Sequence, residues 1–285
     1  MSPQCKRFLV LVRVPSVAFH PVMPCSCPLT IHRGTISIGS RLSGVSNAGR
    51  GIYGLLNIPP GIPKRRTTAM IKLKDPVSGL THFIGLVLAV TGLVFLIWGA
   101  THPVRPVHIV AFSVFGAGMI LLYTASTLYH WLPVSETVSQ RLRKIDHMMI
   151  FILIAATYTP VCLIPLRGAW GWSLFGVIWG LTVIGILMKI FWMEAPRWLY
   201  TLIYIATGWV AVIAIWPLIQ ALHLGGMVWL FLGGLFYTTG AVIYAIRRPD
   251  PWPRVIGFHE IFHVFVMMGT FSHFWMMYRY VMPFS

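Results

Sequence analysis

The feature that most constrains this chain is a series of long apolar segments without charge. No Lys, Arg, Asp or Glu occurs between Trp198 and Ile246. About 20 apolar residues suffice to cross a bilayer as a helix, so this stretch is too long for one crossing. Residues 220–226 provide a polar, glycine-containing turn within it. Two transmembrane helices are therefore expected here.

Similar segments continue from residue 80 to the end of the chain. We expect spans at 80–100, 108–130, 147–166, 169–189, 198–219, 227–246 and 256–278. Hydrophobic residues make up 57% of the chain and charged residues only 10%, whereas soluble domains are about one quarter charged. The 4 Cys are too few for a secreted disulfide scaffold. The sequence predicts an all-α fold, a seven-transmembrane helical bundle.

The distribution of positive charge predicts the orientation of this bundle. If the N-terminus is cytoplasmic, 19 of the 22 Lys and Arg fall in inner segments, Lys189 and Arg197 among them. The outer segments then carry only Arg105, Arg167 and Arg279. Because cytoplasmic loops are enriched in Lys and Arg, we expect a multi-pass protein of the cell (plasma) membrane, with its C-terminus outside. The net charge of +16 is then explained without nucleic acid, and no nucleic-acid partner is expected.

Residues 1–69 differ from the rest of the chain. They are rich in Pro, Arg, Ser and Gly, contain no Asp or Glu, and have no sustained helical or strand period. We expect a disordered basic N-terminal extension, which is not native if translation starts at Met70. Residues 70–285 are expected to form the transmembrane domain.

Ionisable side chains inside transmembrane spans are costly and often mark function. His259 and His263 are four residues apart, so on a helix both imidazoles lie on one face and can reach a single metal ion. The alternative is that each histidine only hydrogen-bonds a neighbouring helix. Ser126 and His130 have the same spacing at the end of the second span.

Alternation of the spans places several polar residues at one depth. Asp146 begins the third span, and Asp75, Ser78 and His82 lead into the first. We therefore expect His82, His130, Asp146, His259 and His263 in the cytoplasmic half of the membrane. Three imidazoles with an open fourth position are typical of catalytic zinc, and a nearby carboxylate can orient a water or a ligand. His147 points about 100° away from Asp146 on a helix, so we do not assign it to the site.

These motifs together resemble one family. The segments are STLYH at 126–130, KIDH at 144–147, TYTP at 157–160 and HEIFH at 259–263. In this order over residues 72–281, they resemble hemolysin III proteins, the bacterial branch of the progestin and adipoQ receptor superfamily. The family's first motif is Glu-x-x-Asn-x-x-x-His, and here it departs at two positions, Asp75 and Ser78.

The resemblance implies a site and a function. It implies that His130, His259 and His263 bind zinc, that Asp146 holds the water on it, and that Ser126 supports the ligand geometry. By similarity to adiponectin receptors and alkaline ceramidases, it implies a zinc-dependent hydrolase of lipid amides, or a factor in membrane lipid homeostasis, with membrane lipids as partners. The substrate, the oligomeric state and the roles of Asp75, Ser78 and His82 stay open.

Two other functions are compatible with the sequence. One is a pore-forming cytolysin, or hemolysin, or a regulator in which zinc is structural. The other is a metalloprotease, because the residues from His259 to His263 also match HExxH, with Glu260 as the base.

Overall fold

The computed structural model describes residues 73–252 and 255–284. The extension expected at residues 1–69 lies outside the described residues. The described ranges form eight α-helices and two short irregular turns of helix. Their bounds are α1 Pro76–Thr101, α2 Pro106–Trp131, α3 Glu136–Leu163, α4 Ala169–Phe191, α5 Arg197–Gly208, η1 Val210–Ala214, α6 Ile215–Ala221, α7 Leu224–Ile246, α8 Phe258–Met276 and η2 Met277–Val281.

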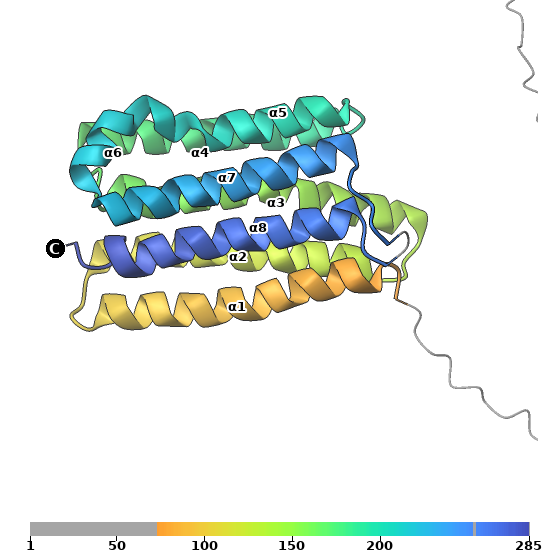
Figure 1. Ribbon diagram of the computed structural model, residues 1–285, viewed down its shortest axis with the longest axis horizontal. Helices are drawn as coiled ribbons and strands as arrows, with labels where there is room; N and C mark the ends of the chain where they lie inside the picture. The colour runs from red at the N-terminus through yellow and green to blue at the C-terminus, as the bar shows by residue number, and fades with distance from the viewer. Residues whose placement is uncertain (1–72, 253–254, 285) are drawn as a thin grey trace, which may run out of the picture. The chain divides into compact units, whose positions relative to one another are not determined.

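These elements make seven rods that run side by side, because α5, η1 and α6 together form one rod (Figure 1). Six of the seven are long and apolar enough to cross a membrane: α1, α2, α3, α4, the combined rod Arg197–Ala221, and α7. The seventh rod, α8, is less apolar because it carries His259, Glu260, His263 and His273. The prediction of an all-α seven-helix bundle is confirmed.

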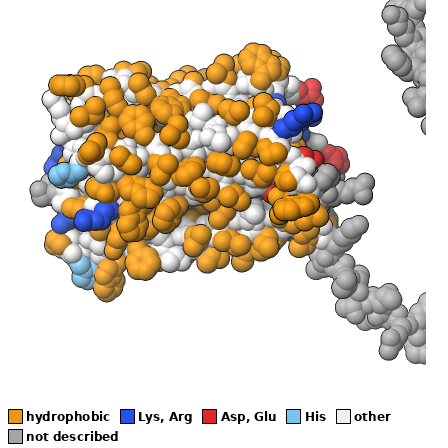
Figure 2. All heavy atoms as spheres, in the orientation of Figure 1, with side chains coloured by type: hydrophobic (Ala, Val, Ile, Leu, Met, Phe, Trp, Pro, Cys, Tyr) orange, Lys and Arg blue, Asp and Glu red, His pale blue; other side chains and the backbone are white. Residues whose placement is uncertain are grey.

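The surface and interior of the bundle suit a lipid environment. Large apolar side chains such as Leu88 and Val94 point outward, with 59% and 61% of their surface exposed. Polar side chains such as Ser126, Thr159 and Thr182 are buried. Hydrophobic side chains cover the middle of the face shown in Figure 2, and Lys, Arg, Asp and Glu lie towards its two ends. This distribution is the one expected of a membrane protein, in which lipid rather than water contacts the sides.

Helix α3 begins at Glu136, well before the start of the predicted third span at residue 147. Its first turns carry Arg141, Arg143 and Lys144, which is why hydropathy alone did not include them. A helix does not have to stop where its apolar part stops. The extension matters because it carries Arg143 next to the turn that holds Asp146 and His147.

The order of packing places α1 between α2 and α8. Helix α1 packs on both of these neighbours, α2 packs on α3, and α8 packs on α7. The α2–α3 contact is especially close at Gly118, where an added Cβ would lie 2.4 Å from the Cβ of Ala156. Small residues allow such close approach of transmembrane helices. As a result, the end of α2 and the starts of α1 and α8 meet at one end of the bundle, which we call the site end.

The fifth rod is broken, and the side chain of Tyr158 lies in the break. The hydroxyl of Tyr158 donates to the carbonyl of Gly208 at 2.6 Å and accepts the amide N–H of Ala211 at 2.8 Å. Pro217, downstream in α6, has no N–H to offer the preceding turn. The α-helical ladder therefore gives way to η1, and Tyr158 satisfies two backbone groups that lipid could not.

Candidate metal centre

Three histidines from two helices converge at the site end. His130 lies in the last turn of α2, and His259 and His263 lie in the first two turns of α8. One ring nitrogen from each lies within 4.8 Å of the others. The Nε2 atoms of His130 and His259 are 3.1 Å apart. The i, i+4 spacing on α8 and its approach to the end of α2 thus produce a group that could hold a metal ion.

The separation of two of these nitrogens is close to that of two ligands of one metal ion. Zinc–nitrogen bonds of about 2.0–2.1 Å in a tetrahedron place two ligand nitrogens about 3.3 Å apart. The 3.1 Å between His130 and His259 is close to this value. Imidazole is a ligand for zinc, copper, iron and nickel, so the donor set favours a transition metal and zinc itself stays a prediction.

Two of the three imidazoles have hydrogen-bond partners at Nδ1, and these partners can orient the rings as metal ligands. Nδ1 of His130 lies 3.2 Å from Oδ2 of Asp75. Nδ1 of His263 lies 3.2 Å from the carbonyl oxygen of Ser78 and 3.1 Å from the hydroxyl of Thr81. The Thr81 hydroxyl itself donates to the Ser78 carbonyl, so both oxygens can accept from His263. A proton on Nδ1 leaves the Nε2 lone pair of each neutral ring free for a metal.

The ring of His82 packs directly against the ring of His263. The two rings stack with their centroids 3.6 Å apart, and His82 is 3% exposed. Neither ring nitrogen of His82 has a hydrogen-bond partner in the part of the chain that the structure describes. The sequence left the roles of Asp75, Ser78 and His82 open. The structure places all three against the candidate ligands, Asp75 from the residue before α1 and Ser78 and His82 from α1 itself.

Glu260 lies beside the three histidines but is occupied by structural contacts. Its Oε1 accepts the hydroxyl of Ser78, and its Oε2 accepts the backbone N–H of Gly257 at 2.8 Å. The second bond caps the start of α8, where a carboxylate is also favoured by the helix dipole. Glu260 therefore ties the start of α8 to α1.

An apolar cavity of about 220 Å³ opens next to the histidines. Its polar wall at the site end includes His82, Ser126, Asp146, His259 and His263. Asp146 and Ser126 are both buried there, so the structure brings them to the same cavity as two of the three candidate ligands. Their predicted roles, holding a water and supporting the ligands, stay predictions.

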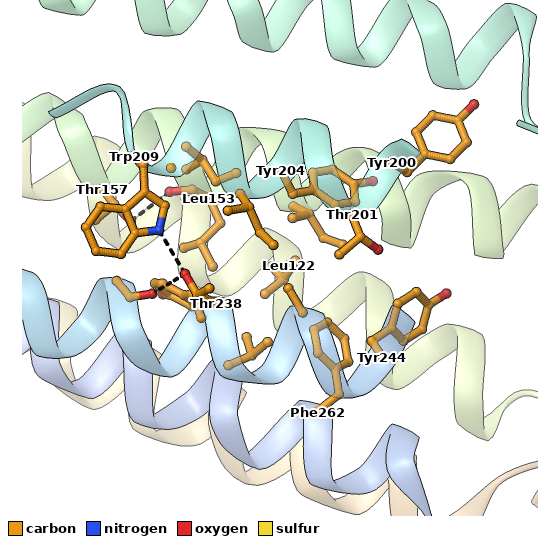
Figure 3. A pocket seen from close by; sticks show the side chains of 18 of the residues that line it. Leu122, Leu153, Thr157, Tyr200, Thr201, Tyr204, Trp209, Thr238, Tyr244 and Phe262 are labelled. Carbon is orange, nitrogen blue, oxygen red and sulfur yellow. Dashed lines mark hydrogen bonds between the residues drawn. The ribbon is translucent and has the colours of Figure 1, made fainter. Parts of the chain in front are cut away.

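The rest of this cavity runs between α5, α7 and α3 (Figure 3). Its walls include apolar side chains such as Leu122, Leu153 and Phe262. Away from the histidines, Nε1 of Trp209 donates to the hydroxyl of Thr238 at 2.8 Å. The indole N–H is therefore paired with a side chain of the cavity wall and does not need a partner in the cavity. The space suits an acyl chain better than a hydrated solute, because most of its lining is apolar.

Sequence reasoning missed a basic part of the cavity wall. Arg143, His147, Lys189 and Arg197 all line it. Lys189, the last residue of the expected fourth span and counted with the inner charges, lies in the last turn of α4 with only 2% of its surface exposed. A signal was present, because Thr182, Gly185 and Lys189 share the buried face of α4 at helical spacing. His147 faces the same cavity although it was set aside from the site.

Comparison with known proteins agrees with these findings. The sequence model of the family described as "Haemolysin-III related" matches residues 70–274. The "Hemolysin-3 homolog" of Bacillus subtilis (strain 168) is 38% identical over 206 residues, covering 72% of this chain and 93% of that protein. "Hemolysin-3" of Bacillus cereus is 37% identical over 218 residues, covering 76% and 96%. "Heptahelical transmembrane protein 5" of Arabidopsis thaliana is 30% identical over 190 residues, covering 60% and 50%. The chain therefore belongs to the haemolysin-III related family of membrane proteins.

Proposed function

We propose that the protein hydrolyses an amide bond of a membrane lipid at a zinc ion held by His130, His259 and His263. The observation that carries this proposal is the convergence of the three imidazoles beside an apolar cavity whose wall also contains a buried carboxylate, Asp146. A histidine cluster that served only to join helices would not need such a cavity. The outer faces of the helices are apolar, so lipid would surround the helices that form the cavity.

Hydrolysis adds water across the carbon–nitrogen bond. The carbonyl carbon gains OH and the nitrogen gains H, so the products are a carboxylic acid and an amine. Zinc bound by three imidazoles with an open fourth position lowers the pKa of water to about 7 and polarises a carbonyl group. Asp146 would accept the proton of the attacking water at a carboxylate oxygen and pass it to the leaving nitrogen, as a positioned general base does.

The surrounding residues would keep this arrangement in place. The Asp75 carboxylate and the Ser78 carbonyl can accept hydrogen bonds from the Nδ1 atoms of His130 and His263, which would leave Nε2 as the ligand atom. Ser126 lies one helical turn before His130 and lines the cavity. Its hydroxyl would orient the carboxylate of Asp146 or the water between Asp146 and the metal.

The protease alternative loses support because of Glu260. The zincin reading needs a glutamate that is free to activate water. Here both carboxylate oxygens of Glu260 accept hydrogen bonds, from the Ser78 hydroxyl and the Gly257 amide. We therefore assign the general-base role to Asp146 and a structural role to Glu260.

Cytolysis is the second candidate, because the two Bacillus relatives are named hemolysins. A wide water-filled path needs polar residues along its whole length. The described cavity is lined mainly by apolar side chains beyond its basic and histidine-containing end. A pore would then have to form between copies of the chain, and zinc would be structural.

The deciding experiment uses purified full-length protein in a neutral detergent. Metal content is measured by mass spectrometry, and ceramide, as a lipid amide, is followed for release of fatty acid. We expect about one zinc per chain and release of the acid. His263→Ala should lose both zinc and release, and Asp146→Asn should keep zinc and lose release by at least about 100-fold. Glu194→Gln, an exposed carboxylate outside the cavity lining, is the matched control.

Two results would overturn the proposal. One is undiminished zinc in His263→Ala, with His102→Ala, an exposed histidine at the other end of the bundle, as the reference. The other is leakage of dye-loaded liposomes by zinc-loaded protein that releases no fatty acid. The second result would favour cytolysis.

A further inference from the structure

Lys189 is a buried basic residue that makes no ion pair within the residues that the structure describes. Its Nζ donates to Nδ1 of His147 at 3.3 Å and lies 3.1 Å from the centroid of the Tyr200 ring. Neither partner carries negative charge in this contact. A charged ammonium in a membrane span is costly unless it faces a cavity or a partner. Lys189 lines the cavity beside the candidate metal centre, so a partner could reach it there.

Two arginines face the same space. Arg143 of α3 and Arg197 at the start of α5 line the cavity with Lys189. The ion pairs found within residues 73–252 and 255–284 involve Asp75 alone among the acids. Asp146 is the single acidic residue among those that line the cavity. We call Arg143, Lys189 and Arg197 the cationic cluster.

Tyrosine side chains contact the cationic cluster and carry no negative charge to neutralise it. Tyr204 donates its hydroxyl to the backbone carbonyl of His147 at 3.0 Å, which fixes α5 against α3. The guanidinium carbon of Arg197 lies 4.6 Å from the ring centroid of Tyr244. Tyr200, Tyr204 and Tyr244 also line the cavity, and Figure 3 shows all three towards one side of it. Three basic side chains and several phenol groups therefore line a cavity whose other walls, apart from the histidine-containing end, are mainly apolar.

We propose that the cationic cluster binds the anionic group of a lipid, a phosphate or a carboxylate, while its hydrocarbon chain fills the apolar part of the cavity. Guanidinium and ammonium groups bind such oxyanions through charge-assisted hydrogen bonds. As a statement about the substrate, this inference rests on the proposed function and adds a preference for lipid amides with an acidic group over neutral ones such as ceramide. As a statement about binding, it stands on the cavity alone.

The test measures binding of three probes to the purified protein by titration calorimetry in a neutral detergent. The probes are dodecyl phosphate, dodecanol and inorganic phosphate. We expect dodecyl phosphate to bind about ten- to hundredfold more tightly than dodecanol, the effect of hydrogen bonds to charged groups. Inorganic phosphate should fail to displace it at comparable concentration, because it lacks the chain.

Variants assign this preference to the cluster. Lys189→Met keeps the length of the side chain and should remove most of the preference for dodecyl phosphate without weakening dodecanol. Arg143→Gln should reduce it and leaves the buried Lys189 in place, so it remains informative if Lys189→Met does not fold. Arg141→Gln, an exposed residue of the same helix that does not line the cavity, should bind like the parent protein.

Three results would overturn the inference: equal affinity for dodecanol and dodecyl phosphate, an unchanged preference in both cluster variants, or displacement by inorganic phosphate at equal concentration. Its failure is distinct from failure of the proposed function. Binding that depends on Lys189 in a protein that hydrolyses no lipid amide keeps the inference and rejects the enzyme. Hydrolysis with no preference for acidic lipid amides keeps the proposed function and rejects the inference about its substrate.

Discussion

Oδ2 of Asp75 lies 3.2 Å from Nδ1 of His130, although the two residues are 55 positions apart. The same pair is joined a second time, because the backbone N–H of Asp75 donates to the carbonyl of His130 at 2.8 Å. Asp75 is the residue that immediately precedes α1, and His130 lies in the last turn of α2. The start of one helix is therefore locked to the candidate ligand at the end of the next, and the orientation of the imidazole is set with it.

Asp75→Ala is expected to weaken metal binding without loss of the fold. The backbone bond to His130 survives this change, whereas the acceptor for the imidazole proton disappears. Loss of such a ligand-orienting contact costs about 10–100-fold in metal affinity. Zinc affinity measured by competition with a chromogenic chelator checks this. Lys74→Met is the control, since Lys74 contacts the same carboxylate at 3.9 Å but no ligand; equal affinities in all three proteins would contradict the assignment.

Glu260→Gln separates the structural from the catalytic reading of Glu260. A glutamine can still accept the Gly257 N–H and can donate to the Ser78 hydroxyl, so both contacts of Glu260 can persist. We expect loss of about 1 kcal/mol of stability, with zinc content and any hydrolytic turnover retained. Turnover and thermal unfolding measured on one preparation check this. Loss of turnover with zinc and stability intact would restore the protease alternative.

The seven helices were predictable because their apolar segments are long and their breaks carry charge or turn residues. The histidine pair on α8 was predictable from its i, i+4 spacing, and the depth that the pair shares with His130 was predictable from the alternation of helix directions. Both arguments use only the chain order and the geometry of one helix. The pairing of Asp75 with His130 and of Ser78 with Glu260 depends on which helices are neighbours, and sequence spacing does not contain that information.

Lys189 shows a second kind of limit. A single lysine near the end of an apolar segment has the same sequence signature whether it lies in a cytoplasmic loop or is buried at the helix end. Only packing of α4 against α3 and α5 decides between them. For the same reason, His147 was judged by its angle from Asp146, although the cavity is wide enough to receive both side chains.

Removal of the metal is expected to lower thermal stability. A metal that binds only the folded state stabilises it by about 2.7 kcal/mol at 100 times its dissociation constant. Since His130 comes from α2 and His259 and His263 from α8, bound metal should hold these helices together. A membrane-compatible melting assay with and without EDTA checks this. In His263→Ala, EDTA should have no effect, and a shift as large as that of the parent protein would place the metal elsewhere.

Tyr158→Phe is expected to destabilise the bundle without affecting the metal centre. The change removes the hydroxyl that bonds Gly208 and Ala211, which leaves a carbonyl and an amide unpaired beside the helix break. Each buried unpaired group costs about 1–3 kcal/mol, and for a domain of this size 1 kcal/mol corresponds to about 2–4 °C in melting temperature. Tyr278→Phe, at an exposed tyrosine, should leave the melting temperature unchanged. Zinc content should equal that of the parent protein in both variants, because Tyr158 lies beyond the middle of α3 and away from His130. An unchanged melting temperature in Tyr158→Phe would mean that backbone or water replaces the hydroxyl, and that the break in the fifth rod does not depend on it.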